Sequence, residues 1–543
     1  MQYVEVKKRD GLARLGIFQR PNRKIVVPCA VDVKELFPNL KSLVLSNVPL
    51  SADPSFVATY FQPGDDPIAV HPHACANVPH GSCIMVSNWH TALGDPKRYV
   101  TWLITLKEGI PPDTIWYSPA AALPSTVNLL VYSGFDMFDF MGVDLKSIQG
   151  LYCTPEGEFP RTWMEEGMCD CEGCRTNDLF LHNRTALTRE IVLVSRFIER
   201  SQLRELVESR SRLNSSHVAI LRHLDEAYSF LEKRVPLIRH AMILASSSDS
   251  IRRIEVRRFA ERVVHRYLPL SHDVAVLLPC SARKPYSLSR SHRKFIEVID
   301  HRAHELIVTS PLGLVPRDLE RVYPAAHYDV PVTGYWDREE LSIISNIIAQ
   351  YFEKHRYRRI IAHLDGGAQK AVELAADQSG MELEFTCIDH PTSDQSLRAL
   401  GNAVSGEQRL TKNFFIHGII SWQFGKAINT EGMVVLRRTG DTIVSRANSQ
   451  LFSFILDSGL CIPTFEGWEL LGDIYRVHID DFIPHGDILA AGVAKVDPLI
   501  REGDEVFVVG GKAIATGKAA MGAVEMVSSK RGIAVKVRKV LKC

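Results

Sequence analysis

Long hydrophobic runs are missing from this chain of 543 residues. It contains no stretch of about 18 uncharged apolar residues, which a helix needs in order to cross a bilayer. The opening residues, MQYVEVKKRDGLARLG, are charged where a secretory signal would be apolar. We therefore expect a cytoplasmic protein without a membrane partner.

An imbalance of charge is missing as well. The formal net charge is +1, so any basic surface that binds nucleic acid must be local. Hydrophobic residues make up 45% of the chain and charged residues 23%, which is an ordinary globular composition. A chain of this length is expected to fold as about three or four domains.

A disulfide framework is not indicated, because such frameworks occur in short secreted chains. Of the eleven cysteines, eight are scattered singly and three fall between Cys169 and Cys174. Three thiolates and one imidazole make the closed tetrahedral shell that structural zinc prefers, with no position left for a catalytic water. We predict structural Zn²⁺ here, in preference to a chance cluster or a redox pair. The predicted ligands are Cys169, Cys171, Cys174 and His182.

The chain is predicted to fold as four successive stretches. Residues 1–240 mix short strands with Pro- and His-bearing loops, and residues 241–404 alternate apolar strands with helical patterns. Residues 405–471 give a weak, mixed pattern that we interpret as a linker domain, and residues 472–543 alternate short strands with turns. Strand–helix alternation is typical of a parallel α/β sheet, and short strands joined by turns indicate a small β-barrel.

Periodicity predicts individual elements. Apolar residues at helical spacing predict helices over Thr188–Arg210 and Ile251–Tyr267. Within the α/β stretch we expect strands at DVAVLLP, HELIVTS, RRIIAHL and LEFTCID. Helices are expected there over Ser291–Arg302, Arg338–His355 and Gly367–Ser379.

One loop concentrates reactive side chains. The strand DVAVLL runs into PCSARKPYSLSRSH, and the next strands lead into TSPLGLVP and HLDGG. Loops that follow parallel strands meet at one edge of the sheet, where ligands bind. Singly, Cys280 reads as a small buried hydrophobe, Lys284 as a solvated charge and His292 as a helix cap; together they favour a catalytic pocket. The candidate catalytic residues are Cys280, Ser281, Lys284, Tyr286, His292 and Asp365.

The end of the chain is locally basic. Cationic residues alternate with Ile533, Val535 and Val537 on an expected strand, and no acid stands among them. Phosphate binding needs such a local field, while the alternative is a solvated basic tail. The candidate RNA-binding residues are Lys530, Arg531, Lys536, Arg538 and Lys539.

Several segments resemble tRNA-guanine transglycosylases, particularly archaeal ones. These segments are the cysteine loop CDCEGC…LHN with its next helix, the upstream GFDMFDFMGVDLKSIQGLYCT and the N-terminal VKKRDGLARLG. The resemblance places Asp139 at the position of the catalytic nucleophile, with the bracing of a strand end as its other role. Only about 200 residues stand where a complete barrel takes about 250, so it implies a shortened TIM-barrel-like domain.

Two further segments resemble known families. The segment from His485 to Arg538 resembles a PUA domain, a small β-barrel that binds structured RNA. The block PCSARKPYSLSRSH closely resembles the signature of the archaeosine synthase family, whose domain order also fits this chain. The resemblance implies an amidine-forming transferase of archaeosine biosynthesis. Such an enzyme adds a nitrogen nucleophile, from glutamine or lysine, to the nitrile of 7-cyano-7-deazaguanine in the D-arm of tRNA.

The resemblance also implies a partner, and the chemical demands of nitrile addition suggest roles for the loop residues. A radical-SAM partner enzyme completes the reaction in part of the family, and a homodimer is compatible with the sequence. Lys284 or Tyr286 would protonate or polarise the nitrile, and His292 or Asp365 would act as base. Alternatively, Cys280 adds first and gives a thioimidate that the amine displaces. Two other functions stay open: a transglycosylase that exchanges guanine through Asp139, and a non-catalytic subunit that binds tRNA.

Overall fold

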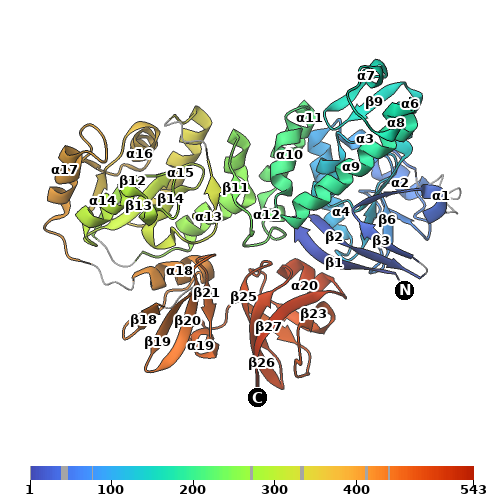
Figure 1. The fold of residues 1–543 in the computed structure, drawn as a ribbon. Coiled ribbons are helices and arrows are strands. Elements are labelled where there is room, and N and C mark those ends of the chain that lie inside the picture. The colour runs from blue at the N-terminus through green and yellow to red at the C-terminus, as the bar shows by residue number, and fades with distance from the viewer. Residues whose placement is uncertain are drawn as a thin grey trace. The chain divides into compact units, whose positions relative to one another are not determined.

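The computed structural model describes residues 2–21, 23–37, 47–75, 77–269, 273–330, 335–409, 414–437 and 441–543 (Figure 1). The fold comprises two compact units. The first contains residues 1–241, 478–504 and 519–536, and the second contains residues 242–477, 505–518 and 537–543. Among the described residues, no helix combines the length and apolar character that crossing a bilayer requires.

The first unit opens with an antiparallel sheet and continues with a parallel one. The antiparallel sheet pairs β1 (Tyr3–Asp10), β2 (Ala13–Arg20) and β3 (Arg23–Val27) in chain order. The parallel sheet has the order β4-β8-β7-β6-β5 and consists of β4 (Cys29–Val31), β5 (Ile68–Ala69), β6 (Cys83–Met85), β7 (Ile115–Tyr117) and β8 (Met137–Asp139). Its central strands are buried along their whole length, as apolar strands covered on both faces are.

The helical stretch predicted over Thr188–Arg210 is helical but broken in two. Helix α9 (Leu179–Glu199) begins after Asp178, whose carboxylate accepts a hydrogen bond from the Leu181 N–H at 3.0 Å. The chain leaves this helix at Ser201, where φ is 55°, and α10 (Leu203–Ser211) follows. The prediction was wrong at this point because a left-handed residue interrupts the helix without any proline or glycine to announce it.

The second unit is built on the predicted α/β sheet, of order β14-β13-β12-β16-β17. Its strands are β12 (Val274–Pro279), β13 (His304–Thr309), β14 (Gly313–Pro316), β16 (Arg359–Ala362) and β17 (Glu384–Phe385). β12 runs parallel to both β13 and β16, as predicted. The segment TSPLGLVP was expected to be a loop, but its apolar half forms β14, antiparallel to β13. β14 is an edge strand, a position that tolerates its Pro316.

Helices cover both faces of this sheet (Figure 1). They are α14 (Arg290–Ile299), α15 (Arg338–Lys354), α16 (Gly366–Ser379) and α17 (Asp394–Val404). The three predicted helices are confirmed with slightly different ends, and α13 (Ile254–His265) confirms the helix that precedes the sheet. Helices α14 and α17 share one core with the sheet, in which Val276 packs with Phe295 and Leu400.

The remaining chain is mostly antiparallel. Residues 414–471 form α18 (Phe414–Phe424), the sheet β18 (Val434–Arg437), β19 (Asp441–Arg446), β20 (Ser449–Ile455) and β21 (Cys461–Pro463), and α19 (Phe465–Leu471). A six-stranded sheet of order β23-β27-β26-β25-β22-β24 ends the chain. Its strands are β22 (Arg476–Ile479), β23 (Ile488–Leu489), β24 (Val493–Val496), β25 (Glu505–Val509), β26 (Ala513–Ala519) and β27 (Ile533–Lys542). The protein is therefore a mixed α/β, multidomain chain.

Candidate functional site

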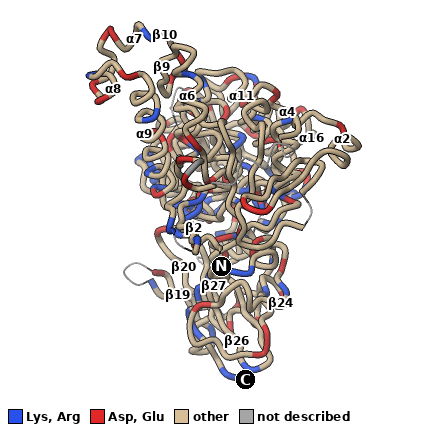
Figure 2. The backbone as a smooth tube through the Cα atoms, turned by 90° about the vertical axis from the view of Figure 1, so that its right-hand side faces the viewer, with Lys and Arg blue, Asp and Glu red and all other residues tan. Residues whose placement is uncertain are grey.

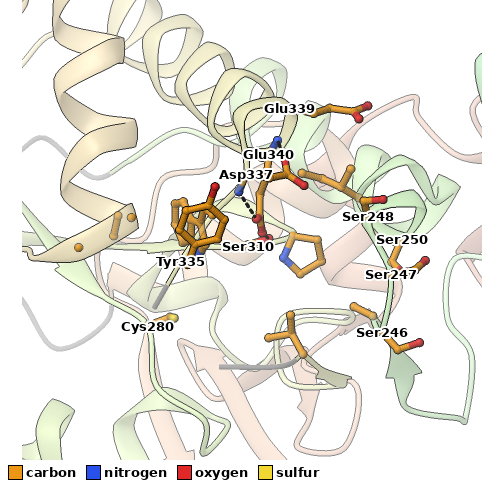
Figure 3. Close-up of a pocket in the computed structure, with 18 of the residues that line it drawn as sticks. Ser246, Ser247, Ser248, Ser250, Cys280, Ser310, Tyr335, Asp337, Glu339 and Glu340 are labelled. Atoms are coloured by element: carbon orange, nitrogen blue, oxygen red, sulfur yellow. Dashed lines mark hydrogen bonds between the residues drawn. The ribbon is translucent and has the colours of Figure 1, made fainter. Parts of the chain in front are cut away.

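The loops that follow the central parallel strands enclose a cavity of about 360 Å³ (Figure 3). Cys280 lines it after β12, Ser310 after β13 and Asp365 after β16. Two other segments complete the wall, residues 245–251 and residues 335–340. The cavity lies at the edge of the sheet where the carboxyl ends of parallel strands meet, as expected from the alternation of strands and helices.

Cys280 presents a thiol to the cavity. Burial raises the pKa of its thiol, while a hydrogen bond from Thr309 and the positive charge of Lys284 act in the opposite direction. Lys284 itself does not line the cavity. Its Nζ lies 3.9 Å from the centre of the Tyr328 ring, and partial burial lowers the pKa of this amine. The thiol and the amine therefore form an interacting pair, each of which eases the ionisation of the other.

Asp365 is the second predicted residue that reaches the cavity. It occupies the N-cap of α16, yet its side chain makes no capping hydrogen bond. Gly366 and Gly367 follow it in the cavity wall. A Cβ on Gly367 would lie 3.0 Å from the Trp336 ring, so the glycine allows the indole to close the wall. The carboxylate of Asp365 is thus held at the cavity by its backbone and not by a cap.

Three other predicted residues do not line the cavity. The Ser281 hydroxyl donates to the Arg283 carbonyl oxygen at 3.0 Å, within its own loop. Tyr286 is buried, with its hydroxyl 2.5 Å from that of Tyr328. His292 is also buried; its Nδ1 accepts from Arg317 at 2.7 Å, and burial lowers its pKa to about 3. Both side chains are thus buried and hydrogen-bonded within the protein, and burial together with the nearby Cys280 thiol raises the pKa of Tyr286.

Sequence reasoning missed most of the acidic wall. Asp337 caps α15, and its capping box with Glu340 is present; Glu340 also accepts a hydrogen bond from Ser310. Tyr335 is 74% exposed at the same wall. The pattern D-x-x-E at residues 337–340 is typical of a helix start, so it did not indicate that these carboxylates also line a cavity. The serines of residues 246–250 gave no signal beyond a turn.

Asp139 lies in the other unit and is fully engaged. Its carboxylate accepts hydrogen bonds from the Tyr117 hydroxyl at 2.7 Å, from the Ala120 N–H at 3.1 and 3.2 Å, and from the Met141 N–H at 2.9 Å. Only 1% of the residue is exposed, and burial raises the pKa of its carboxyl. These contacts support its role as a brace at the end of β8.

Replacing Asp139 with asparagine should therefore affect stability more than turnover. An amide in this place points N–H groups at other donors, which costs about 1–3 kcal/mol of unfolding free energy. Urea unfolding of the variant measures this loss, and turnover on tRNA measures its catalytic effect. A large fall in turnover with unchanged stability would assign Asp139 to the chemistry.

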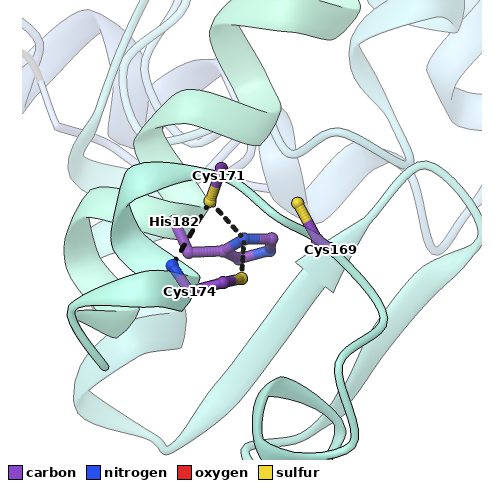
Figure 4. Close-up of side chains that lie close together, drawn as sticks. All are labelled: Cys169, Cys171, Cys174 and His182. Carbon is purple, nitrogen blue, oxygen red and sulfur yellow. Dashed lines mark hydrogen bonds between the residues drawn. The ribbon is translucent and has the colours of Figure 1, made fainter.

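The predicted metal ligands converge in the first unit (Figure 4). One ligand atom from each of Cys169, Cys171, Cys174 and His182 lies within 4.8 Å of all the others. The His182 Nδ1 lies 3.4 Å from the Cys171 sulfur and 3.3 Å from the Cys174 sulfur. Ligand atoms at these separations can surround one tetrahedral ion. The cluster can therefore hold a metal ion, as the spacing predicted.

Neighbouring groups fix the orientation of these ligands. The His182 Nε2 lies 3.1 Å from the Cys153 carbonyl oxygen, so the opposite nitrogen is directed at the sulfurs. The Tyr152 ring stacks on the imidazole at 3.9 Å between centroids. A Cβ on Gly173 would lie 2.3 Å from the His182 N, which only glycine avoids. The loop is thus shaped around the histidine, and the imidazole cannot turn freely.

The surface formed by the basic residues near the chain end also includes an acidic residue, which was not expected. Lys530, Lys536 and Lys539 are exposed, and the expected strand is confirmed as β27. Figure 2 marks the lysines and arginines along the backbone in blue. Arg538 makes two hydrogen bonds to Glu505, at 2.6 and 2.9 Å, so part of its charge is neutralised. The Arg531 guanidinium lies 4.2 Å from the centre of the Tyr3 ring. Lysine supplies most of the local field.

Comparison with known families places two segments. Residues 256–404 match a family described as a domain of unknown function (DUF5591), and residues 476–541 match the PUA domain family. The first match contains the cavity residues from Cys280 to Asp365, and the second confirms the predicted C-terminal PUA domain.

Comparison with curated proteins extends over the whole chain. The chain is 36% identical to the archaeosine synthase of Haloferax volcanii, with 99% of each chain covered. It is 35% identical to the archaeosine synthase subunit alpha of Methanosarcina acetivorans, with both chains covered completely. The tRNA-guanine(15) transglycosylase of Methanobrevibacter smithii is 24% identical over 78% of this chain and 66% of its own. Both families suggested by the sequence motifs thus occur among its relatives.

Proposed function

The chain belongs to the archaeosine synthase family, and from this premise we propose a reaction at the central cavity. It is a tRNA-modifying enzyme of archaeosine biosynthesis. Its reaction adds an amine to the nitrile of 7-cyano-7-deazaguanine in tRNA and forms an amidine. The observation that carries this proposal is the placement of Cys280 and Asp365 in one cavity at the catalytic edge of the sheet.

Cys280 begins the reaction by covalent addition. Its sulfur attacks the nitrile carbon, the nitrile nitrogen takes up the thiol proton, and a thioimidate results. The donor amine then attacks the same carbon, the sulfur leaves and regains a proton, and the amidine is released. Neither oxidation nor reduction is involved. Lys284 favours the thiolate through its positive charge, and Asp365 accepts the proton that the incoming ammonium must lose.

The base to be modified needs an aromatic surface once it leaves the tRNA stack. Tyr335 and Trp336 adjoin each other in the cavity wall, and Tyr335 is 74% exposed. Base–aromatic stacking contributes about 1–3 kcal/mol per base. We assign the exposed ring of Tyr335 to this contact, which would hold the nitrile carbon near the Cys280 sulfur.

The charge of the cavity selects the nitrogen donor. Four carboxylates line it, and among the described residues no lysine, arginine or histidine does. The carboxylates belong to Asp337, Glu339, Glu340 and Asp365, of which Glu339 forms an ion pair with Arg252. Lysine carries one more positive charge than glutamine, and an acidic cavity attracts the more cationic ligand. We therefore assign lysine as the donor, in preference to glutamine.

Removing one cavity carboxylate should weaken the use of lysine. Asp337→Asn keeps a good N-cap for α15 but loses the charge. The KM for lysine should rise about 5- to 10-fold, which equals about 1–1.4 kcal/mol of lost attraction, while the KM for tRNA stays constant. Asp377→Asn is the matched control, because Asp377 lies exposed near the end of α16 and outside the cavity.

The identity of the donor is tested by mass analysis. Nitrile-bearing tRNA is incubated with the wild type and either lysine, glutamine or ammonium, and the modified nucleoside is weighed. Lysine should give an adduct that retains the whole amino acid. Equal use of glutamine, with Asp337→Asn indistinguishable from Asp377→Asn, would contradict the assignment while leaving amine addition itself intact.

Further assignments belong to the rest of the chain. We propose Zn²⁺ as the ion of the cysteine–histidine cluster, because three thiolates and one imidazole in a closed shell suit zinc best. We also propose that β4–β8 are a shortened TIM-barrel-like domain, since β4 pairs with the last strand β8 while the others follow chain order. We propose a radical-SAM partner from the family resemblance, and a homodimer as an assembly compatible with the sequence.

A further inference from the structure

A second cavity, of about 500 Å³, lies within the first unit. It is bordered by the end of α4 (Pro96–Gly109), by residues 9–14 of the N-terminal hairpin and by residues 522–528 near the chain end. Six of its lining side chains are basic, namely those of Arg9, Arg14, His80, Lys107, Lys233 and Arg234. This cavity shares no residue with the one around Cys280.

Three of the basic side chains are neutralised within the protein. Arg9 forms an ion pair with Glu525, and Arg14 forms one with Asp136 at 2.7 Å. The His80 Nδ1 lies 3.0 Å from an Asp113 oxygen. These contacts tie the cavity walls together. They leave Lys107, Lys233 and Arg234 as its remaining positive charges.

Lys107 is held at the cavity without a counter-ion. Its Nζ donates to the Gly134 carbonyl oxygen at 2.8 Å and lies 3.4 Å from the centre of the Trp116 ring. Within the described chain it makes no ion pair, and burial lowers the pKa of this amine well below its usual value. Space is kept for it, because a Cβ on Gly134 would lie 2.7 Å from Nζ. Lys107 is partly buried, and the nearby Asp136 carboxylate only partly offsets this loss of hydration, so an anionic ligand would further favour the ammonium form.

Lys233 and Arg234 lie beside it. Lys233 is exposed, whereas the Arg234 guanidinium stacks 3.8 Å from the centre of the Phe230 ring and donates to the Phe230 carbonyl oxygen at 2.9 Å. Neither makes an ion pair among the described residues. The stacked, partly immobilised guanidinium is a rigid donor, which suits recognition of a phosphate oxygen. The cavity opening thus combines the ammonium group of Lys233 with the planar guanidinium of Arg234.

We propose that this cavity binds a phosphate group of the tRNA backbone. The inference rests on tRNA being the substrate, and it adds a contact remote from the chemistry. Phosphate suits the site because its charge would offset the three cations, two lysines and one arginine. A carboxylate of a protein partner fits less well, because Glu108, Glu502 and Glu525 at the same rim would repel it. A phosphodiester chain is also repelled by these acids, but it brings a negative charge with every nucleotide.

The test measures tRNA affinity against salt for charge variants of the cavity. The double variant Lys233→Gln/Arg234→Gln should weaken tRNA binding about 10-fold, and the slope of log K against log[salt] should become shallower by about 1–2. Glu108→Gln removes an exposed acid of the same cavity and should strengthen binding. A loss of folding would weaken tRNA binding in both variants, so it would not produce effects of opposite sign. Lys24→Gln is the matched control, an exposed lysine outside the cavity.

Turnover separates this proposal from the proposed function. At saturating tRNA, the double variant should retain wild-type kcat and show only a raised KM for tRNA. If amine addition fails in the wild type while the charge variants still change tRNA binding as described, the proposed reaction is wrong and the phosphate site stands. If the double variant binds tRNA as the Lys24→Gln control does, the phosphate site is overturned.

Inorganic phosphate distinguishes the two sources of the anion. Titrated into the wild type, it should compete with tRNA, and the double variant should lose this competition. Should phosphate bind the wild type and not the double variant, with no difference in tRNA affinity between them, the cavity takes a free phosphate. That outcome would contradict the assignment to RNA.

Discussion

Replacing Cys280 with alanine is expected to lower amine addition to nitrile-bearing tRNA about 10³-fold, equivalent to about 4 kcal/mol of activation free energy. The thiol lines the cavity and forms the first covalent bond of the proposed reaction. Binding of tRNA should be unchanged, because a group used only on the way to the transition state contributes little to ground-state affinity. Single-turnover kinetics and equilibrium binding measure the two effects separately.

Trapping makes this expectation specific to covalent catalysis. Without an amine donor, the wild type and nitrile-bearing tRNA should form a protein–RNA adduct that survives denaturation. Cys280→Ala should form none, and the exposed Cys543→Ala should form as much as the wild type. Full turnover by Cys280→Ala would exclude the thioimidate and leave direct attack by the amine.

Lys284 acts through the thiol, and its variant should show this in the pH profile. Its positive charge lowers the pKa of the Cys280 thiol, so Lys284→Met should raise that pKa. The rising limb of activity should therefore move to higher pH, and activity lost at neutral pH should partly return in alkaline solution. A uniform loss at every pH would indicate a structural role instead.

The sequence predicted the edge of the sheet that bears the cavity but not which side chains line it. The parallel strands β12, β13 and β16 follow from runs of apolar residues, and the rule for strand ends then brings Cys280 and Asp365 together. Runs of apolar residues do not, however, predict which way each side chain of the following loop points. Tyr286 and His292 stand in the same motif, yet both are buried, where they form hydrogen bonds with Tyr328 and Arg317.

The acidic wall of the cavity could not be predicted from the sequence for a related reason. Asp337 and Glu340 read as ordinary helix-start residues, and their local role is confirmed by the capping box. Their second role depends on where α15 packs relative to the strand ends, which is a tertiary fact. The metal ligands are the opposite case, since four ligands within a short segment limit the loop to conformations that a single ion can close.

Replacing Cys171 with serine should remove both the bound metal and part of the first unit's stability. The Cys171 sulfur accepts from the Cys174 N–H at 3.4 Å and caps α8 (Glu172–Arg175), so it joins the ion to the backbone of the loop. A hydroxyl is a weak zinc ligand, and losing a metal site falls among the largest single-residue effects, on the order of 4 kcal/mol or more. We expect about one zinc per wild-type chain and almost none in the variant.

Cys75→Ser provides the matched control, because Cys75 is a half-buried cysteine of the same unit that stands outside the cluster. It should retain the metal and the wild-type unfolding transition. In Cys171→Ser, limited proteolysis should cut first in the cysteine loop, since the core of β9 (Leu151–Thr154) and α9 beside it depends on the Tyr152–His182 stack. Metal-free wild type that unfolds like the metal-bound form would contradict a structural ion. A wild-type mass lower by one pair of hydrogens would instead identify the thiols as a redox pair.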